Sequence, residues 1–195
     1  MRKQRQEIHL HVVTISHGLS ELCISQSLKS NLRIKHGLET KHKGRESVQI
    51  TSLLAFLNQK HLKTQKGFLK KYDDIENSKG TLLNFQLFPV MDLDDCKEED
   101  KAAYLDKSMF KDHWLYPYII PIYNDPNLES TMKKAGIPVE KKKDYIRLFP
   151  TNHGNDLDME TAWDFYQKLR DCPCTNMEIY VKYCIDIAQK MQNEY

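Results

Sequence analysis

Two aspartates separated by one residue, Asp92 and Asp94, are the clearest candidates for chemistry in this chain. They follow an apolar run, 82–91, that is typical of a strand buried on both faces. Residues two apart in a strand point the same way, so both carboxylates are expected on one side of the chain as it leaves the sheet. Carboxylate oxygens suit Mg²⁺ or Mn²⁺, and Asp95 is a further candidate metal ligand. The alternative is that these are ordinary surface acids, with Asp92 capping a helix that begins near Lys97.

A second polar group, HGLSE at 17–21, follows a predicted strand over 8–16 that is rich in β-branched residues. Ligands of open α/β sheets gather beyond the carboxyl ends of the strands, so this group is expected near the two aspartates. His17 can carry a proton near neutral pH or ligate a metal, and Glu21 can add a carboxylate. Alternatively, His17 only shapes a turn and Glu21 only complements a helix dipole.

A basic segment over 35–45 is predicted to be a short strand or a loop, and it is the candidate surface for a nucleic-acid backbone. The candidate substrate-binding residues in it are Lys35, Lys41, Lys43 and Arg45. The alternative is a solvated face with no partner. Weaker candidates elsewhere are Asn124 and Glu129, which follow another strand-like run, and His153 in a polar loop.

An alternation of strands and helices must position these residues. Segments of helical periodicity separate the apolar or β-branched runs, and they are predicted over 19–34, 47–62, 97–110 and 127–135. Two more helices are predicted from Met159 onward, with a turn around Pro173 between them. This order predicts an α/β fold with a mostly parallel sheet flanked by helices. The C-terminal helices either pack on this sheet or form a partner surface.

The composition narrows the class of protein. With 195 residues, of which 40% are hydrophobic, the chain can bury one core, and we expect a single domain over 1–195. The formal net charge of +2 does not identify a partner by itself. No run approaches the roughly 20 apolar residues that cross a bilayer. We therefore expect no membrane partner. The five scattered cysteines favour reduced thiols in a cytoplasmic protein, and Cys172-Pro-Cys174 is interpreted as a turn.

The strand that leads into HGLSE and the later buried strand that leads into DLDD together resemble the Toprim domain of primases, topoisomerases and overcoming-lysogenization-defect nucleases. In that family the first strand usually ends in an acidic residue followed by Gly, and a later strand ends in DxD. The resemblance covers a Toprim-like core over 8–135 and leaves 136–195 as a C-terminal helical extension packed on the core. His17 departs from the pattern because the family has Glu there, and Glu21 is the candidate replacement.

The resemblance implies a nuclease or related phosphotransfer enzyme that depends on Mg²⁺ or Mn²⁺ and acts on DNA or RNA, for example in bacterial defence. Its implied catalytic residues are His17, Glu21, Asp92 and Asp94, and its implied metal ligands are Glu21, Asp92, Asp94 and Asp95. A homo-oligomer or a partner protein fits the same picture.

Two other functions are considered. The first is a catalytically inactive Toprim-like module that binds a nucleotide or nucleic acid within a complex, which His17 favours. The second is a receiver-like or flavodoxin-like phosphotransfer protein, but the Lys that it needs at a neighbouring strand end is not found. The sequence contains no GxxxxGK[ST] phosphate-binding loop, which argues against nucleotide hydrolysis by that route.

Overall fold

The computed structural model describes residues 9–137, 139, 141–154 and 156–193. Its centre is a four-stranded sheet in the order β2-β1-β5-β6, and every neighbouring pair in this sheet is parallel. The strands are β1 (Val12–Ser16), β2 (His36–Glu39), β5 (Gln86–Asp92) and β6 (Ile122–Asn124). The predicted α/β fold with a mostly parallel sheet is therefore confirmed.

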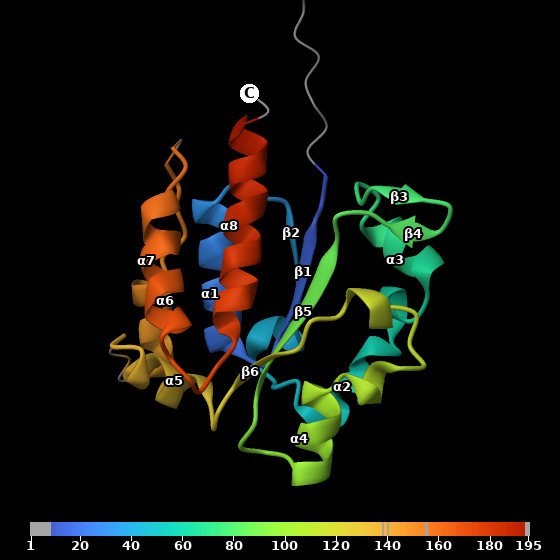
Figure 1. The fold of residues 1–195 in the computed structure, drawn as a ribbon, viewed down its shortest axis with the longest axis horizontal. Coiled ribbons are helices and arrows are strands. Elements are labelled where there is room, and N and C mark those ends of the chain that lie inside the picture. The colour runs from blue at the N-terminus through green and yellow to red at the C-terminus, as the bar shows by residue number, and fades with distance from the viewer. Residues whose placement is uncertain (1–8, 138, 140, 155, 194–195) are drawn as a thin grey trace, which may run out of the picture.

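Helices flank this sheet on both faces (Figure 1). One face carries α1 (Leu19–Asn31), α7 (Met159–Arg170) and α8 (Met177–Asn193), with α5 (Leu128–Lys134) and α6 (Tyr145–Leu148) beside them. The opposite face carries α2 (Ile50–Leu57), α3 (Gln65–Lys71) and α4 (Glu98–Leu105). A small antiparallel hairpin of β3 (Asn77–Ser78) and β4 (Thr81–Leu82) lies beyond α3.

The alternation of side chains along the central strands explains the two layers. In β1, Val12 belongs to the apolar cluster on the α1 and α8 face, whereas Val13 and Ile15 belong to the cluster on the α2 and α4 face. In β5, Phe88 and Leu87 divide between the same two clusters. Successive side chains of a strand point to opposite faces, so strands covered on both sides are apolar along most of their length.

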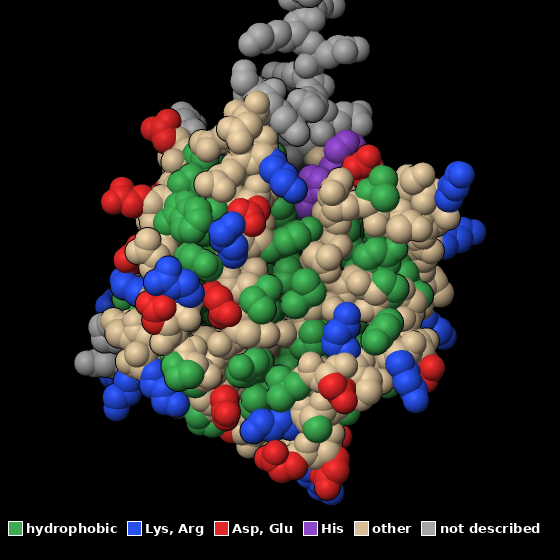
Figure 2. Space-filling model, in the orientation of Figure 1, with side chains coloured by type: hydrophobic (Ala, Val, Ile, Leu, Met, Phe, Trp, Pro, Cys, Tyr) green, Lys and Arg blue, Asp and Glu red, His purple; other side chains and the backbone are tan. Residues whose placement is uncertain are grey.

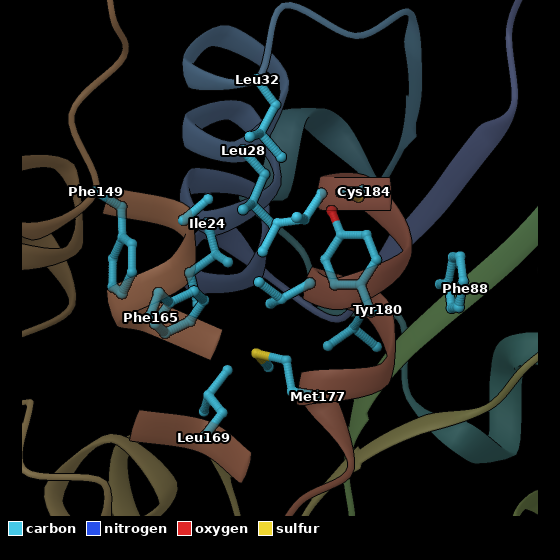
Figure 3. Close-up of a cluster of buried hydrophobic side chains, with 14 of the residues drawn as sticks. Ile24, Leu28, Leu32, Phe88, Phe149, Phe165, Leu169, Met177, Tyr180 and Cys184 are labelled. Atoms are coloured by element: carbon cyan, nitrogen blue, oxygen red, sulfur yellow. The ribbon is translucent and has the colours of Figure 1, made fainter. Parts of the chain in front are cut away.

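The C-terminal helices supply much of the core on the first face. Figure 3 shows Tyr180 and Met177 of α8 packed between side chains of α1, such as Ile24 and Leu28, and Phe88 of β5. Tyr180 is 1% exposed, and its ring centroid lies 5.2 Å from that of Phe88. These aromatic side chains of α8 are therefore packing residues of the sheet's own core.

Several local predictions need correction. The long strand expected over 82–91 is β5, which spans Gln86–Asp92, and the strand-like run over 116–124 forms a strand only at Ile122–Asn124. The segment between residues 62 and 82, for which the sequence predicted no element, contains α3 and the β3-β4 hairpin. The first strand was predicted from Ile8, a residue that lies outside the described part, and it begins at Val12 in the structure. The short helix over 127–135 is confirmed as α5, where the Asn127 side chain accepts a hydrogen bond from Ser130 N.

The strand order creates one switch point. From β1 the chain crosses through α1 to β2 on one side, and it then returns over the other face through α2 and α3 to β5 on the far side of β1. Crevices in open α/β sheets form at such points, outside the carboxyl ends of the strands. The expected ligand position is therefore between the ends of β1 and β5, at the lower end of the sheet in Figure 1.

Within the described ranges, no helix is both long and apolar enough to cross a bilayer.

Candidate active site

The ends of β1 and β5 bring Glu21 and Asp92 to this switch point. Gly18 is the N-cap residue of α1, and its backbone N–H donates a hydrogen bond to Glu21 Oε2 at 2.8 Å. This contact is one half of a capping box, since Gly18 has no side chain to accept from the N3 backbone N–H, and it ties the first turn of α1 to the end of β1. Glu21 is 4% exposed, so it is a buried carboxylate and not a solvated first-turn acid.

Asp92 is the last residue of β5 and is 7% exposed. Its Oδ1 accepts a hydrogen bond from Leu128 N at 3.0 Å and another from Asn124 Nδ2 at 3.4 Å. The alternative role predicted for Asp92, capping the helix after Cys96, is wrong because Lys97 is the N-cap residue of α4 and has no side-chain capping bond. Asp92 instead joins β5 to the neighbouring strand β6 and to the start of α5.

Asp94 and Asp95 lie in the turn after β5, and both are exposed. The strand has ended at Asp92, so the expectation that Asp92 and Asp94 share one side of a strand is not met. Asp94 Oδ2 accepts a hydrogen bond from Asn127 Nδ2 at 2.7 Å. Asp94 is still close enough for its charge to raise the pKa of Asp92, whereas Asp95 is not among the groups that act on Asp92.

Both buried carboxylates have raised pKa values, and the charge of Glu21 acts on Asp92. Burial raises the pKa of Asp92 to about 7, and the negative charges of Glu21 and Glu129 act in the same direction. Burial also raises the pKa of Glu21 to about 7, although backbone N–H groups, including that of Gly18, partly oppose the rise. Desolvation and like charge both disfavour the ionised carboxylate, so protons or another cation are favoured between these groups.

His17 lies beside this pair, immediately after β1. Its backbone N–H donates to Val90 O at 3.0 Å, and its carbonyl accepts from Val48 N at 2.8 Å, so both neighbouring segments fix its position. The positive form of His17 would lower the pKa of Asp92, which places the ring within electrostatic reach of that carboxylate. His17 Nδ1 is buried and has no hydrogen-bond partner among the described residues.

Two groups that the sequence signals only weakly also belong to the site. Asn124 is 0% exposed and contacts both Asp92 and Thr175, whose hydroxyl lies 3.1 Å from Asn124 Oδ1. Glu129, in the first turn of α5, raises the pKa of both Glu21 and Asp92. The site is therefore built from the ends of three neighbouring strands and the helices that follow them.

Sequence reasoning missed Tyr145 and Lys142, which come from the segment between α5 and α7. Lys142 Nζ lies 4.0 Å from Glu129 Oε1, and the charge of Lys142 lowers the pKa of Glu21. Tyr145, the first residue of α6, is 0% exposed, and its pKa is raised by burial and by Glu129, Glu21 and Asp92. Neither residue stands in a recognisable motif, so only the tertiary packing of this segment on α1 identifies them.

The predicted basic surface divides into two parts. Lys41, Lys43 and Arg45 lie in and beside the turn that follows β2, at the same edge of the sheet as Glu21; we call these three residues the basic turn. Gly44 within this turn packs against the backbone of Leu19, the first residue of α1. On the face seen in Figure 2, Lys and Arg side chains alternate with Asp and Glu and form no continuous basic patch.

The remaining candidates lie away from the site. Lys35 precedes β2, at the opposite end of the sheet, and its Nζ lies 2.5 Å from Asp74 Oδ2. His153 is exposed in a loop that Arg33 holds near the carboxyl end of α1. The turn predicted at Cys172-Pro-Cys174 separates α7 from α8, and its two sulfur atoms are 3.0 Å apart as free thiols.

In the part of the chain that the structure describes, no group of three or more His, Cys, Asp or Glu side chains is arranged to hold a metal ion. Glu21 and Asp92 are thus a pair and not a complete protein cage. Comparison of the chain with protein-family models, curated proteins and solved structures finds no match. Any functional assignment therefore depends on the site itself and on the two sequence motifs.

Proposed function

We propose that this chain is a metal-dependent nuclease or related phosphotransfer protein of Toprim-like type. It acts on nucleic acid at the ends of β1 and β5. The observation that carries the proposal is the pair Glu21 and Asp92, two buried carboxylates at the switch point of a parallel sheet, close enough for the charge of Glu21 to raise the pKa of Asp92. Among the described residues, neither carboxylate has an ion-pair partner within 4.0 Å.

The chemistry of the donor set fits Mg²⁺ or Mn²⁺. Magnesium sites commonly use only one or two carboxylates and leave the other positions to water and substrate phosphate, so a carboxylate pair is sufficient. Glu21 and Asp92 would hold the ion, with Asp94 beside them in the turn after β5. Their raised pKa values mean that a cation relieves an unfavourable arrangement of charge.

A bound divalent cation supplies charge stabilisation for a phosphodiester and its leaving oxygen. Residues of the chain supply proton transfer and binding of the phosphate backbone. His17 lies within electrostatic reach of Asp92 and has a ring nitrogen free of hydrogen bonds within the described part, so it can accept or return a proton at Nδ1. The basic turn lies at the same edge of the sheet and can neutralise backbone phosphates.

Glu21 can also supply the carboxylate that the Toprim pattern has at the position of His17. A carboxylate is absent at the end of β1 itself, but the capping contact with Gly18 brings the Glu21 carboxylate back to that strand end. This arrangement supports the catalytic alternative, in which Glu21 replaces the missing Glu.

The inactive binding module is the second candidate. It is favoured by the exposed position of Asp94 and by its hydrogen bond to Asn127, which leave one aspartate of the motif outside the buried pair. Such a module would still bind nucleic acid but would not cleave it.

A cytoplasmic location is proposed with either function. All five cysteines are free thiols, including the close pair Cys172 and Cys174, and free thiols fit a reducing compartment.

The test is a cleavage assay on labelled single-stranded and double-stranded DNA and RNA, with Mg²⁺, with Mn²⁺ and with chelator. The variants are Glu21→Gln and Asp92→Asn, and the matched control is Asp95→Asn, an exposed neighbour. Loss of an outer-shell partner of a metal site typically costs about 10- to 100-fold, so removal of a direct ligand should cost at least about 100-fold. Cleavage that needs the metal, falls in both site variants and survives in the control supports the proposal. Binding without cleavage under every condition supports the inactive module and contradicts the nuclease.

A further inference from the structure

Tyr145 carries a hydroxyl group that the folded chain leaves unused. The residue is 0% exposed, and its ring stacks on Phe149 at a centroid distance of 6.1 Å with an interplanar angle of 18°. Its hydroxyl has no hydrogen-bond partner within the described ranges. Buried polar groups in folded proteins are nearly all hydrogen-bonded, and leaving one unpaired costs stability. A phenylalanine would fill the same apolar space without that cost.

The surroundings of this hydroxyl are acidic. The charges of Glu129, Glu21 and Asp92 each raise the pKa of Tyr145, so all three act on the same phenol. The phenol therefore stays protonated and is a hydrogen-bond donor. Three acceptor groups lie within electrostatic reach, yet none of them accepts its hydrogen bond. An acceptor bound among these carboxylates would satisfy the unpaired hydroxyl.

The position of Tyr145 is fixed by packing. It begins α6, and both α6 and the short helical turn before it, Lys142–Asp144, contact α1, the helix that carries Glu21. Lys142 in that turn adds a positive charge that acts on Glu21. The segment thus presents one neutral donor and one cation toward an otherwise acidic site, which suits a ligand with negatively charged oxygen atoms.

We infer that Tyr145 is a ligand-binding residue that donates a hydrogen bond to a phosphate oxygen of a nucleotide or nucleic acid held at Glu21 and Asp92 together with a divalent cation. This inference rests on the proposed function, because a phosphate group enters an acidic site only when a cation accompanies it. It assigns to the segment after residue 136 a part in the site, beyond its packing on the core.

The test measures nucleotide binding separately from cleavage. Thymidine 5′-monophosphate is titrated in the presence of Mn²⁺, and the rise in melting temperature gives the apparent affinity of each variant. Tyr145→Phe removes only the hydroxyl. The matched control is Tyr183→Phe, which also removes one tyrosine hydroxyl. Tyr183 lies in α8, and its hydroxyl lies 3.0 Å from Asn84 O in the segment before β5, away from Glu21.

The expected result is that Tyr145→Phe binds the nucleotide about tenfold more weakly, as for loss of a hydrogen bond to a charged group, while Tyr183→Phe binds as wild type does. Without nucleotide, Tyr145→Phe should melt at the wild-type temperature or above it. Unchanged nucleotide affinity in Tyr145→Phe overturns the inference and means that water or empty space lies beside the hydroxyl. A wild-type protein whose melting temperature does not respond to the nucleotide also overturns it.

The cleavage assay then separates the two proposals. If Tyr145→Phe weakens nucleotide binding but wild type cleaves no nucleic acid, the inference stands and the nuclease function falls. If wild type cleaves and Tyr145→Phe cleaves and binds equally well, the nuclease function stands and the inference falls.

Discussion

The buried pair predicts an unusual dependence of stability on pH. In the unfolded chain Asp92 ionises near its ordinary pKa of 3.8, but in the folded protein its pKa is about 7. Between these values the folded state holds more protons than the unfolded state, so the free energy of unfolding falls as pH rises. Most ion-paired carboxylates give the opposite pH dependence, in which the free energy of unfolding rises with pH, because their pKa values are lowered on folding.

The magnitude follows from the width of the pH window. From about pH 5 to about pH 7 the slope is about 1.4 kcal/mol per pH unit for one group, so Asp92 accounts for a loss of about 3 kcal/mol. Asp92→Asn keeps an oxygen that can accept from Leu128 N but removes the titration. The free energy of unfolding is therefore measured by urea unfolding with chelator present, at about pH 5 and about pH 8. Its decrease between these two pH values should be about 3 kcal/mol smaller in Asp92→Asn than in wild type.

Two comparisons make this measurement decisive. Asp95→Asn, in the exposed turn, should keep the wild-type dependence on pH. Addition of Mn²⁺ at about pH 8 should raise the free energy of unfolding of the wild-type protein, because the cation replaces the lost protons, and should not raise that of Asp92→Asn. Equal pH dependence in wild type and Asp92→Asn would refute the reasoning, since it would mean that Asp92 is not titrating near neutrality.

Other substitutions test the elements that position the site. Gly44→Ala should destabilise the protein by about 1–3 kcal/mol in thermal or urea unfolding, because φ is +81° there and a Cβ would lie 2.9 Å from Leu19 Cα; wild-type stability would contradict the close packing of the basic turn on α1. Tyr104→Phe should cost about 1–3 kcal/mol in the same measurement, because the Tyr104 hydroxyl lies 2.8 Å from carbonyl oxygens of both Pro89 and Ile122, and no loss would mean that this bond does not join β5 to β6. Replacing all three residues of the basic turn by Ala should weaken binding of DNA and lower the salt slope by up to about 3, with Lys35→Ala as the control at the other end of the sheet; equal effects of both variants would contradict the placement of the basic turn beside the site.

The predicted layers depended on patterns that act locally. The apolar run that ends at Asp92 and the β-branched run that ends at Ser16 each require burial on both faces, and helical periodicity between them requires a crossover. Each of these constraints lies within one short segment of the sequence, so the parallel sheet could be predicted from them. The hairpin of β3 and β4 escaped prediction because its strands have only two residues each and carry no periodicity.

The site was predictable only in part. Glu21 and Asp92 stand at strand ends, and the rule for open sheets brings such ends together. Asp94 was predicted on the assumption that the strand continues past Asp92, whereas the backbone turns there and Leu93 N bonds to Asn124 O at 3.1 Å and Pro126 O at 2.9 Å. Tyr145 could not be predicted, because its contribution arises from the packing of α6 on α1, which no spacing in the sequence encodes.

The most direct test of the central claim is a calorimetric titration of Mn²⁺ into wild type, Asp92→Asn and Glu21→Gln at about pH 8, with Asp95→Asn as control. The account predicts saturable binding to one site in wild type and in Asp95→Asn, and affinity at least about 100-fold lower in each variant of the buried pair. Equal Mn²⁺ affinity in wild type and in both variants of the buried pair would contradict the claim that Glu21 and Asp92 hold a divalent cation.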